Sequence, residues 1–197
     1  MSRVKLVLLL VLWGAVVGAG LLAIRQYETT PGKSAVVKSD WPAVSRIQLS
    51  GNQATLVMLA HPQCPCTRAS MAQLARLLTE LQNRVAAHVI FVIPEAVMAK
   101  GDTVAAHWRD TDLVNLALAI PGVTVSFDEG GIEAQRFGAT TSGHVCLFTP
   151  SGKLAFEGGI TDARGHEGDN AGQNAIVQIV NGRDPETTRT DVFGCGL

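Results

Sequence analysis

Charge of either sign is scarce in this chain of 197 residues, since 16 Lys and Arg stand against 17 Asp and Glu, a formal net charge of −1. A phosphate-binding domain would be expected to carry a clustered basic face, so the sequence predicts no nucleic-acid partner. The 20 glycines and 8 prolines do not suggest a collagen-like chain, and 47% apolar residues exclude a disordered one. The length suits one ordinary domain and a short appendage, but not a two-domain enzyme.

Cysteine is also rare in this sequence. Four cysteines are too few for a small protein held together by a disulfide framework, but they are enough for one redox or metal site. Two of them, Cys64 and Cys66, are separated by a single residue. We therefore expect the redox or metal site of the protein at this pair.

One long hydrophobic run stands near the N-terminus, where residues 6–24 contain no charged or polar side chain. As a helix rising about 1.5 Å per residue, this run spans roughly 28 Å, close to the hydrocarbon core of a bilayer. Arg3 and Lys5 precede it, which favours an N-terminus on the inner side. We predict an N-terminal membrane anchor over residues 1–27, single-pass in the cell inner membrane, with the remainder in the periplasm. A cleaved signal peptide is the alternative.

The rest of the chain divides by composition. Residues 28–40 are polar and lack periodicity, which predicts a flexible stalk. A folded domain is expected over residues 41–182, followed by a C-terminal tail, 183–197, that contains Cys195.

Within the folded segment, apolar runs alternate with helical periodicity. Strands are expected at 47–49, 55–60, 89–93, 123–127, 144–148 and 154–157, and helices at about 66–81, 112–120, 132–137 and 170–181. This order predicts an α/β fold with a mixed central β-sheet flanked by helices, preceded by one transmembrane helix.

The first buried strand and the first long helix are joined by His61-Pro-Gln-Cys-Pro-Cys66. Because a residue before proline avoids the α region and proline suits the first helical position, we expect Cys64 at the N-cap and Pro65 as the first helical residue. Free N–H groups and the helix dipole would then stabilise the Cys64 thiolate and make it the nucleophile. Cys66 would be the resolving thiol. The small ring of a Cys64–Cys66 disulfide predicts a comparatively oxidising couple.

Other interpretations of the same residues remain open. His61, Cys64 and Cys66 offer one imidazole and two thiolates to a soft ion such as copper, so a metal-binding or metallochaperone module is the principal alternative. A thiol peroxidase is a third possibility.

Strand, Cys-Pro-Cys motif and helix, followed by a hairpin and a final helix, resemble the thioredoxin superfamily, particularly its membrane-tethered TlpA-like group. The segments HPQCPCTRAS, TDARGHEGDNAG and VFGC are similar to bacterial RedB-type thioredoxin-like proteins. The superfamily resemblance covers residues 41–182. It implies a thioredoxin-like fold and a thiol–disulfide oxidoreductase, with Cys64 as nucleophile, Cys66 as resolving thiol, a protein thiol or disulfide as partner and no soluble cofactor.

Three features depart from the pattern of that superfamily. The cysteines are separated by one residue rather than two, the strand before them has no acidic residue, and Gly143 stands where a cis-proline is expected. Since that proline discourages metal capture between the thiols, its replacement favours the metal alternative.

Further candidates lie near the end of the chain. Arg164 and His166 belong to a loop that, in thioredoxin-like folds, runs beside the cysteines, where a positive charge would stabilise a thiolate; a glycine-rich turn is the other interpretation. Cys195 follows a polar segment of eight residues, 183–190, which at about 3.3 Å per residue is long enough to return to Cys64. We hypothesise that Cys195 is an auxiliary resolving thiol or a third soft ligand. Cys146 lies in an apolar strand and is expected to be structural.

Overall fold

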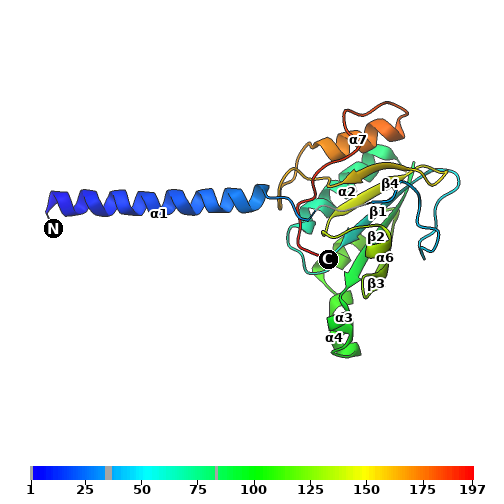
Figure 1. Ribbon diagram of the computed structural model, residues 1–197, viewed down its shortest axis with the longest axis horizontal. Coiled ribbons are helices and arrows are strands. Elements are labelled where there is room, and N and C mark those ends of the chain that lie inside the picture. Colours follow the sequence, from blue (N-terminus) through cyan, green and yellow to red (C-terminus); the bar gives the residue numbers. More distant parts are fainter. Residues whose placement is uncertain (1, 34–36, 83) are drawn as a thin grey trace.

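A long N-terminal helix stands apart from the rest of the molecule in Figure 1. The computed structural model describes residues 2–33, 37–82 and 84–197. Helix α1 (Arg3–Thr29) has 27 residues, none of them buried, and it is long and apolar enough to cross a membrane by length and composition. An apolar helix near the N-terminus fits either a membrane anchor or a signal sequence.

Five strands of the described residues form one mixed sheet in the order β3-β2-β1-β4-β5. The strands are β1 (Ala54–Ala60), β2 (Val85–Ile93), β3 (Val123–Glu129), β4 (His144–Phe148) and β5 (Leu154–Gly158). Strands β1, β2 and β3 are parallel, whereas β4 and β5 are antiparallel to their neighbours. The mixed sheet flanked by helices confirms the predicted fold class.

Two apolar clusters cover the two faces of this sheet, because successive residues of the central strand point to opposite sides. In β1, Leu56 and Met58 belong to one cluster, and Val57 and Leu59 to the other, and all four are fully buried. The first cluster is closed by α2 (Thr67–Leu81), α5 (Asp112–Leu118) and α7 (Ala171–Val180). The second is closed by α6 (Ile132–Arg136) and by the aromatic ring of Trp41.

Some predicted elements differ from those observed. Residues 47–49 do not form a strand; Ile47 and Leu49 instead pack their side chains against the second cluster. Two short helices, α3 (Glu95–Met98) and α4 (Asp102–Arg109), were not predicted, and they project from the domain in Figure 1. Helix α4 has eight residues, of which only Ala105 is buried, so it offers too few core-facing positions for the repeating pattern by which longer helices are recognised.

Residues on both sides of the predicted domain contact it and each other. The Gly32 N–H donates to the Val192 carbonyl oxygen at 2.8 Å, and the Lys33 carbonyl accepts from the Thr140 hydroxyl at 3.0 Å. Farther along, the Glu157 N–H donates to the Thr188 carbonyl oxygen at 3.0 Å, so the tail runs beside β5. Residues 34–36 of the predicted stalk lie outside the described residues.

Candidate active site

The loop between β1 and α2 brings Cys64 to the start of the helix through tight turns. The Thr67 N–H donates to the Cys64 carbonyl at 3.2 Å, and the Arg68 N–H to the Pro65 carbonyl at 3.3 Å, both three residues back. The regular helix begins at Thr67 with Cys66 at the N-cap position. The expectation that Cys64 is the N-cap and Pro65 the first helical residue is therefore wrong by two residues, because three-residue turns precede the α-helical bonds.

The Cys64 sulfur is nearly enclosed and surrounded by donors. The Sγ atoms of Cys64 and Cys195 lie 3.0 Å apart, and the Cys195 N–H donates to Cys64 Sγ at 3.4 Å. Burial alone would raise the pKa of Cys64, but hydrogen bonds from Thr67 and Cys195 outweigh it and lower the pKa to about 7. Cys64 is therefore the thiol of this site that ionises near neutral pH.

The two neighbouring thiols are held in the protonated form. Burial and the nearby charge of Cys64 raise the pKa of Cys66, an effect that Arg164 partly offsets. Burial and the hydrogen bond to Cys64 raise the pKa of Cys195 to about 12, so Cys195 keeps its proton when Cys64 ionises and its S–H can then donate to the Cys64 thiolate. One thiolate thus lies among two thiols, which is the ionisation pattern needed for thiol–disulfide exchange.

Ser142 and Thr67 form a buried hydroxyl pair that connects the parts of this site. Their oxygen atoms lie 2.6 Å apart, and the His61 N–H donates to Ser142 Oγ at 2.7 Å. The Ser142 N–H donates in turn to the Cys195 carbonyl oxygen at 2.8 Å. Sequence reasoning missed both hydroxyl residues, although each directly adjoins a residue that was singled out, Cys66 or Gly143.

Gly143 shapes the segment that carries Ser142. Its φ of +89° lies in the left-handed region, and a Cβ atom there would approach Ser70 Oγ to 3.0 Å. Its N–H donates to the Leu59 carbonyl at 2.8 Å, which fixes this segment beside β1. Glycine at this position therefore allows the chain to turn tightly against α2.

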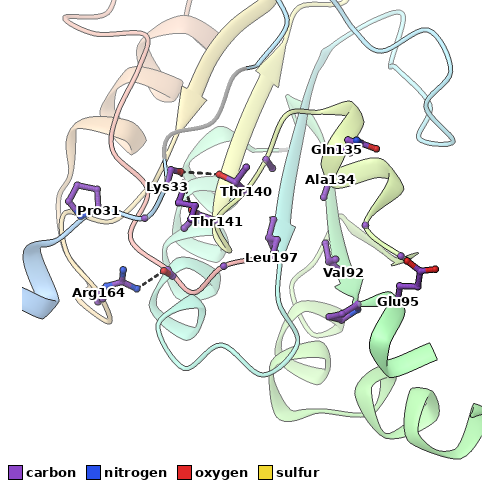
Figure 2. Close-up of a pocket in the computed structure, with 17 residues that line it drawn as sticks. Pro31, Lys33, Val92, Glu95, Ala134, Gln135, Thr140, Thr141, Arg164 and Leu197 are labelled. Atoms are coloured by element: carbon purple, nitrogen blue, oxygen red, sulfur yellow. Dashed lines mark hydrogen bonds between the residues drawn. The ribbon is translucent and has the colours of Figure 1, made fainter. Parts of the chain in front are cut away.

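Arg164 and His166, which belong to one loop, differ in whether they contact the site. The Arg164 guanidinium donates to the Gly194 carbonyl, as Figure 2 shows, and lies 4.9 Å from the centre of the Tyr27 ring. The ring of His166 is exposed, with Nδ1 3.0 Å from the Arg164 carbonyl oxygen. Of the two, Arg164 is the residue whose charge acts on Cys66.

The imidazole ring of His61, which lies close to the cysteines in the sequence, has interaction partners of its own. Its Nδ1 accepts from the Gln63 N–H at 3.1 Å, and its ring meets Trp108 edge to face at 5.1 Å. Burial lowers the pKa of His61, so the imidazole is neutral at pH 7. Among residues 2–33, 37–82 and 84–197, no three His, Cys, Asp or Glu side chains are grouped so that they could hold a metal ion. The donors predicted for copper, His61, Cys64 and Cys66, do not form such a group.

A groove of about 870 Å³ lies beside the tail (Figure 2). Its walls include Gly194, Gly196 and Leu197 of the tail and Thr140 and Thr141 of the facing segment. Neither Cys64 nor Cys195 is among the residues that line this groove.

Comparisons with known proteins agree with the topology of the sheet. No protein-family model matches the chain, and no curated protein matches its sequence. An uncharacterized conserved protein from Geobacillus kaustophilus and a hypothetical protein from Sinorhizobium meliloti each share 18% identity with it at a TM-score of 0.58, over 85% of this chain and 91% and 93% of theirs. The chain has a thioredoxin-like fold.

At this identity the likeness concerns the fold alone. A secreted disulfide oxidoreductase from Mycobacterium tuberculosis, 14% identical, aligns with a TM-score of 0.43 over 68% of this chain and 84% of its own. The narrower resemblance to RedB-type proteins stays a prediction.

Proposed function

We propose that the protein is a thiol–disulfide oxidoreductase that acts on protein partners, with Cys64 as nucleophile and Cys66 as resolving thiol. The observation that carries the proposal is the Cys64 sulfur itself, which accepts hydrogen bonds from Thr67 and Cys195 at the start of α2 and whose charge acts on the neighbouring Cys66 thiol. No metal or soluble cofactor is required for this chemistry.

The reaction proceeds in two exchanges. The Cys64 thiolate attacks one sulfur of a partner disulfide, forming a mixed disulfide and releasing one partner thiolate. Cys66 then loses its proton and attacks Cys64 Sγ, which forms the Cys64–Cys66 disulfide and releases the second partner thiolate. Two electrons pass from the protein to the partner, and the reverse reaction uses the same steps. Arg164 stabilises the transient Cys66 thiolate.

We further propose that α1 anchors the chain in the cell inner membrane by a single pass, with the sheet domain outside the cytoplasm. The length and apolar surface of α1 support this placement, as do Arg3 and Lys5 at its N-terminal end. An oxidising compartment is also where a disulfide cycle persists.

The proposal is tested by trapping. The full chain, purified in detergent, is incubated with insulin as a disulfide-containing protein, and adducts are mapped by mass spectrometry. Because Cys195 lies beside Cys64, the Cys66→Ser variant is expected to close a Cys64–Cys195 bridge, whereas a Cys66→Ser/Cys195→Ser variant retains the mixed disulfide on Cys64. Cys64→Ser should abolish exchange, and a Cys64→Ser protein that stays active overturns the assignment.

The same preparations test the two alternatives. Stoichiometric copper that is lost on Cys64→Ser substitution, in a protein that exchanges no disulfides, would favour the metal-binding interpretation. Peroxide consumption that is faster than disulfide exchange would favour a thiol peroxidase. Cys146→Ala is the matched control, since Cys146 is fully buried in β4 away from these steps.

A further inference from the structure

Residues 194–197 run antiparallel to residues 140–142 and are held there by main-chain contacts. The Ser142 N–H donates to the Cys195 carbonyl at 2.8 Å, and the Leu197 N–H donates to the Thr140 carbonyl at 3.1 Å. Between these bonds, Thr141 and Gly196 form an antiparallel bridge. This pairing uses main-chain atoms, so it does not by itself require the sequence of the tail.

The register of this pairing places a cysteine on the nucleophile. With the Cys195 carbonyl bonded to Ser142, its Sγ lies 3.0 Å from Cys64 Sγ, and its own N–H points to the same sulfur. An extended segment bound in this register would present its cysteine to Cys64 in the same way. The tail therefore lies where a reacting cysteine must lie.

The residue before the cysteine has no room for a side chain. A Cβ atom on Gly194 would lie 2.0 Å from the Ser142 carbonyl oxygen, a main-chain atom that is fixed by its neighbours. The Arg164 guanidinium donates to the Gly194 carbonyl. By contrast, a Cβ atom on Gly196 would meet nothing within 4 Å. Leu197 packs against the second apolar cluster and anchors the end of the tail.

We propose that residues 194–197 occupy the binding edge for the substrate, and that the substrate is an extended protein segment in which glycine directly precedes the reacting cysteine. This inference rests on the proposed function and names the substrate class of the same site. The tail is then a competitor within the chain, which leaves the edge when a substrate segment binds and returns when it departs.

The returning tail supplies a second resolving thiol, in addition to Cys66. After Cys64 has attacked the disulfide of the bound segment, the segment is joined to Cys64 and its former partner leaves as a thiolate. The Cys195 thiol loses its proton and attacks Cys64 Sγ, so that a Cys64–Cys195 disulfide forms and the segment leaves as a thiolate. A dithiol reductant restores the two thiols by the reverse exchanges.

The test uses hexapeptides that copy residues 192–197, each carrying a thionitrobenzoate group on its cysteine. Attack by Cys64 on the cysteine sulfur releases the coloured thionitrobenzoate thiolate, which gives the rate. One peptide has the natural sequence, a second has alanine before the cysteine and a third has alanine after it. The protein is the full chain with Cys66→Ser and Cys195→Ser, so that nothing resolves the product.

Two glycine substitutions in that protein form a matched pair. Gly194→Ala should unseat the tail and raise the rate with the natural peptide about tenfold, since two main-chain hydrogen bonds of the competitor are lost. Gly51→Ala, which lies outside the tail and whose added Cβ atom would meet nothing within 4 Å, should leave the rate unchanged. On the Gly194→Ala protein, the peptide with alanine before the cysteine should react about tenfold more slowly than the other two, because it cannot keep those bonds. A chain ending at Phe193 should behave like Gly194→Ala.

The outcomes separate this inference from the proposed function. Equal rates for the three peptides, or equal effects of Gly194→Ala and Gly51→Ala, would overturn the substrate class while Cys64 still reacts. The proposed function itself fails if, at neutral pH, Cys64 does not react in any variant, either with the peptides or with a small thionitrobenzoate disulfide.

Discussion

The hydroxyl of Thr67 is the group whose removal should most directly change the reactivity of Cys64. Thr67 is fully buried, and its hydrogen bonds to Cys64 help lower the pKa of that thiol to about 7, so about half of Cys64 is thiolate at pH 7. The Thr67→Val substitution deletes the hydroxyl and keeps the shape of the side chain. The Thr67 N–H and the contacts of Cys195 stay in place.

The expected magnitude follows from the strength of such a bond. A hydrogen bond to a charged group contributes about 1.5–3 kcal/mol, and one pKa unit corresponds to about 1.4 kcal/mol. Thr67→Val should therefore raise the pKa of Cys64 by about one to two units, and the thiolate fraction at pH 7 should fall from about one half to between about one tenth and one hundredth. A more basic thiolate is also more nucleophilic, so the pH midpoint is a better measure than the rate at one pH.

The assay is alkylation of the reduced full chain by iodoacetamide across a pH series, with Cys64 followed by mass spectrometry of its peptide. The wild-type midpoint is expected near pH 7. Thr79→Val is the control, since Thr79 lies on the same helix and its exposed hydroxyl bonds to the Ala75 carbonyl at 2.8 Å. A wild-type midpoint at or above about 8.5, the value of an ordinary thiol, would refute the nucleophile assignment, and an unchanged midpoint in Thr67→Val would refute the role of its hydroxyl.

Three further predictions concern groups outside the exchange. Burial and the charge of Glu157 raise the pKa of Cys146, so Cys146 should stay unlabelled while Cys64 is alkylated and react only in urea; labelling of both at one rate would contradict this. Burial lowers the pKa of His144 to about 4, so the unfolded chain binds more protons below about pH 6.5, and up to about 3 kcal/mol of the free energy of unfolding should disappear as the pH falls to about 4. In urea titrations, His144→Leu should lack this share of the loss, whereas substitution of the exposed His166 by Leu should retain it. The full chain should sediment with membranes, and a reporter fused after Leu197 should be active only if export activates it; a shortened soluble protein would instead identify a cleaved signal peptide.

The sheet could be predicted from sequence because its central strands are buried on both faces. Residues 55–60 form a continuous apolar run, and β1 occupies 54–60. The N-terminal half of β2 was missed, since Ala86, Ala87 and His88 are poor strand formers, and they are held by the ladder to β1. The apolar pattern of a buried strand can be read from neighbouring residues in the sequence, whereas the pairing of two strands depends on residues that are far apart in it.

The same distinction divides the residues of the candidate site. The spacing of Cys64 and Cys66 is a local pattern, and it pointed to the loop where the thiols lie. The contact between Thr67 and Ser142 joins residues 75 positions apart, and no periodicity or motif in the sequence predicts it. For Cys195, the length of the tail showed that this cysteine could reach Cys64. The contact itself depends on main-chain hydrogen bonds to residues 140–142, which only the folded chain reveals.

Arg164 connects this site to the N-terminal helix. Its N–H donates to the Glu28 carbonyl at 2.9 Å, its Nε donates to the Tyr27 carbonyl at 3.2 Å, and its guanidinium also holds the Gly194 carbonyl (Figure 2). Tyr27 and Glu28 belong to the last turn of α1, so one side chain contacts the end of the proposed anchor and the tail over Cys64. If α1 spans the membrane, this geometry holds the exchange site next to the membrane surface. Partners that are themselves tethered to the membrane would then reach Cys64 at a higher effective concentration than partners free in solution.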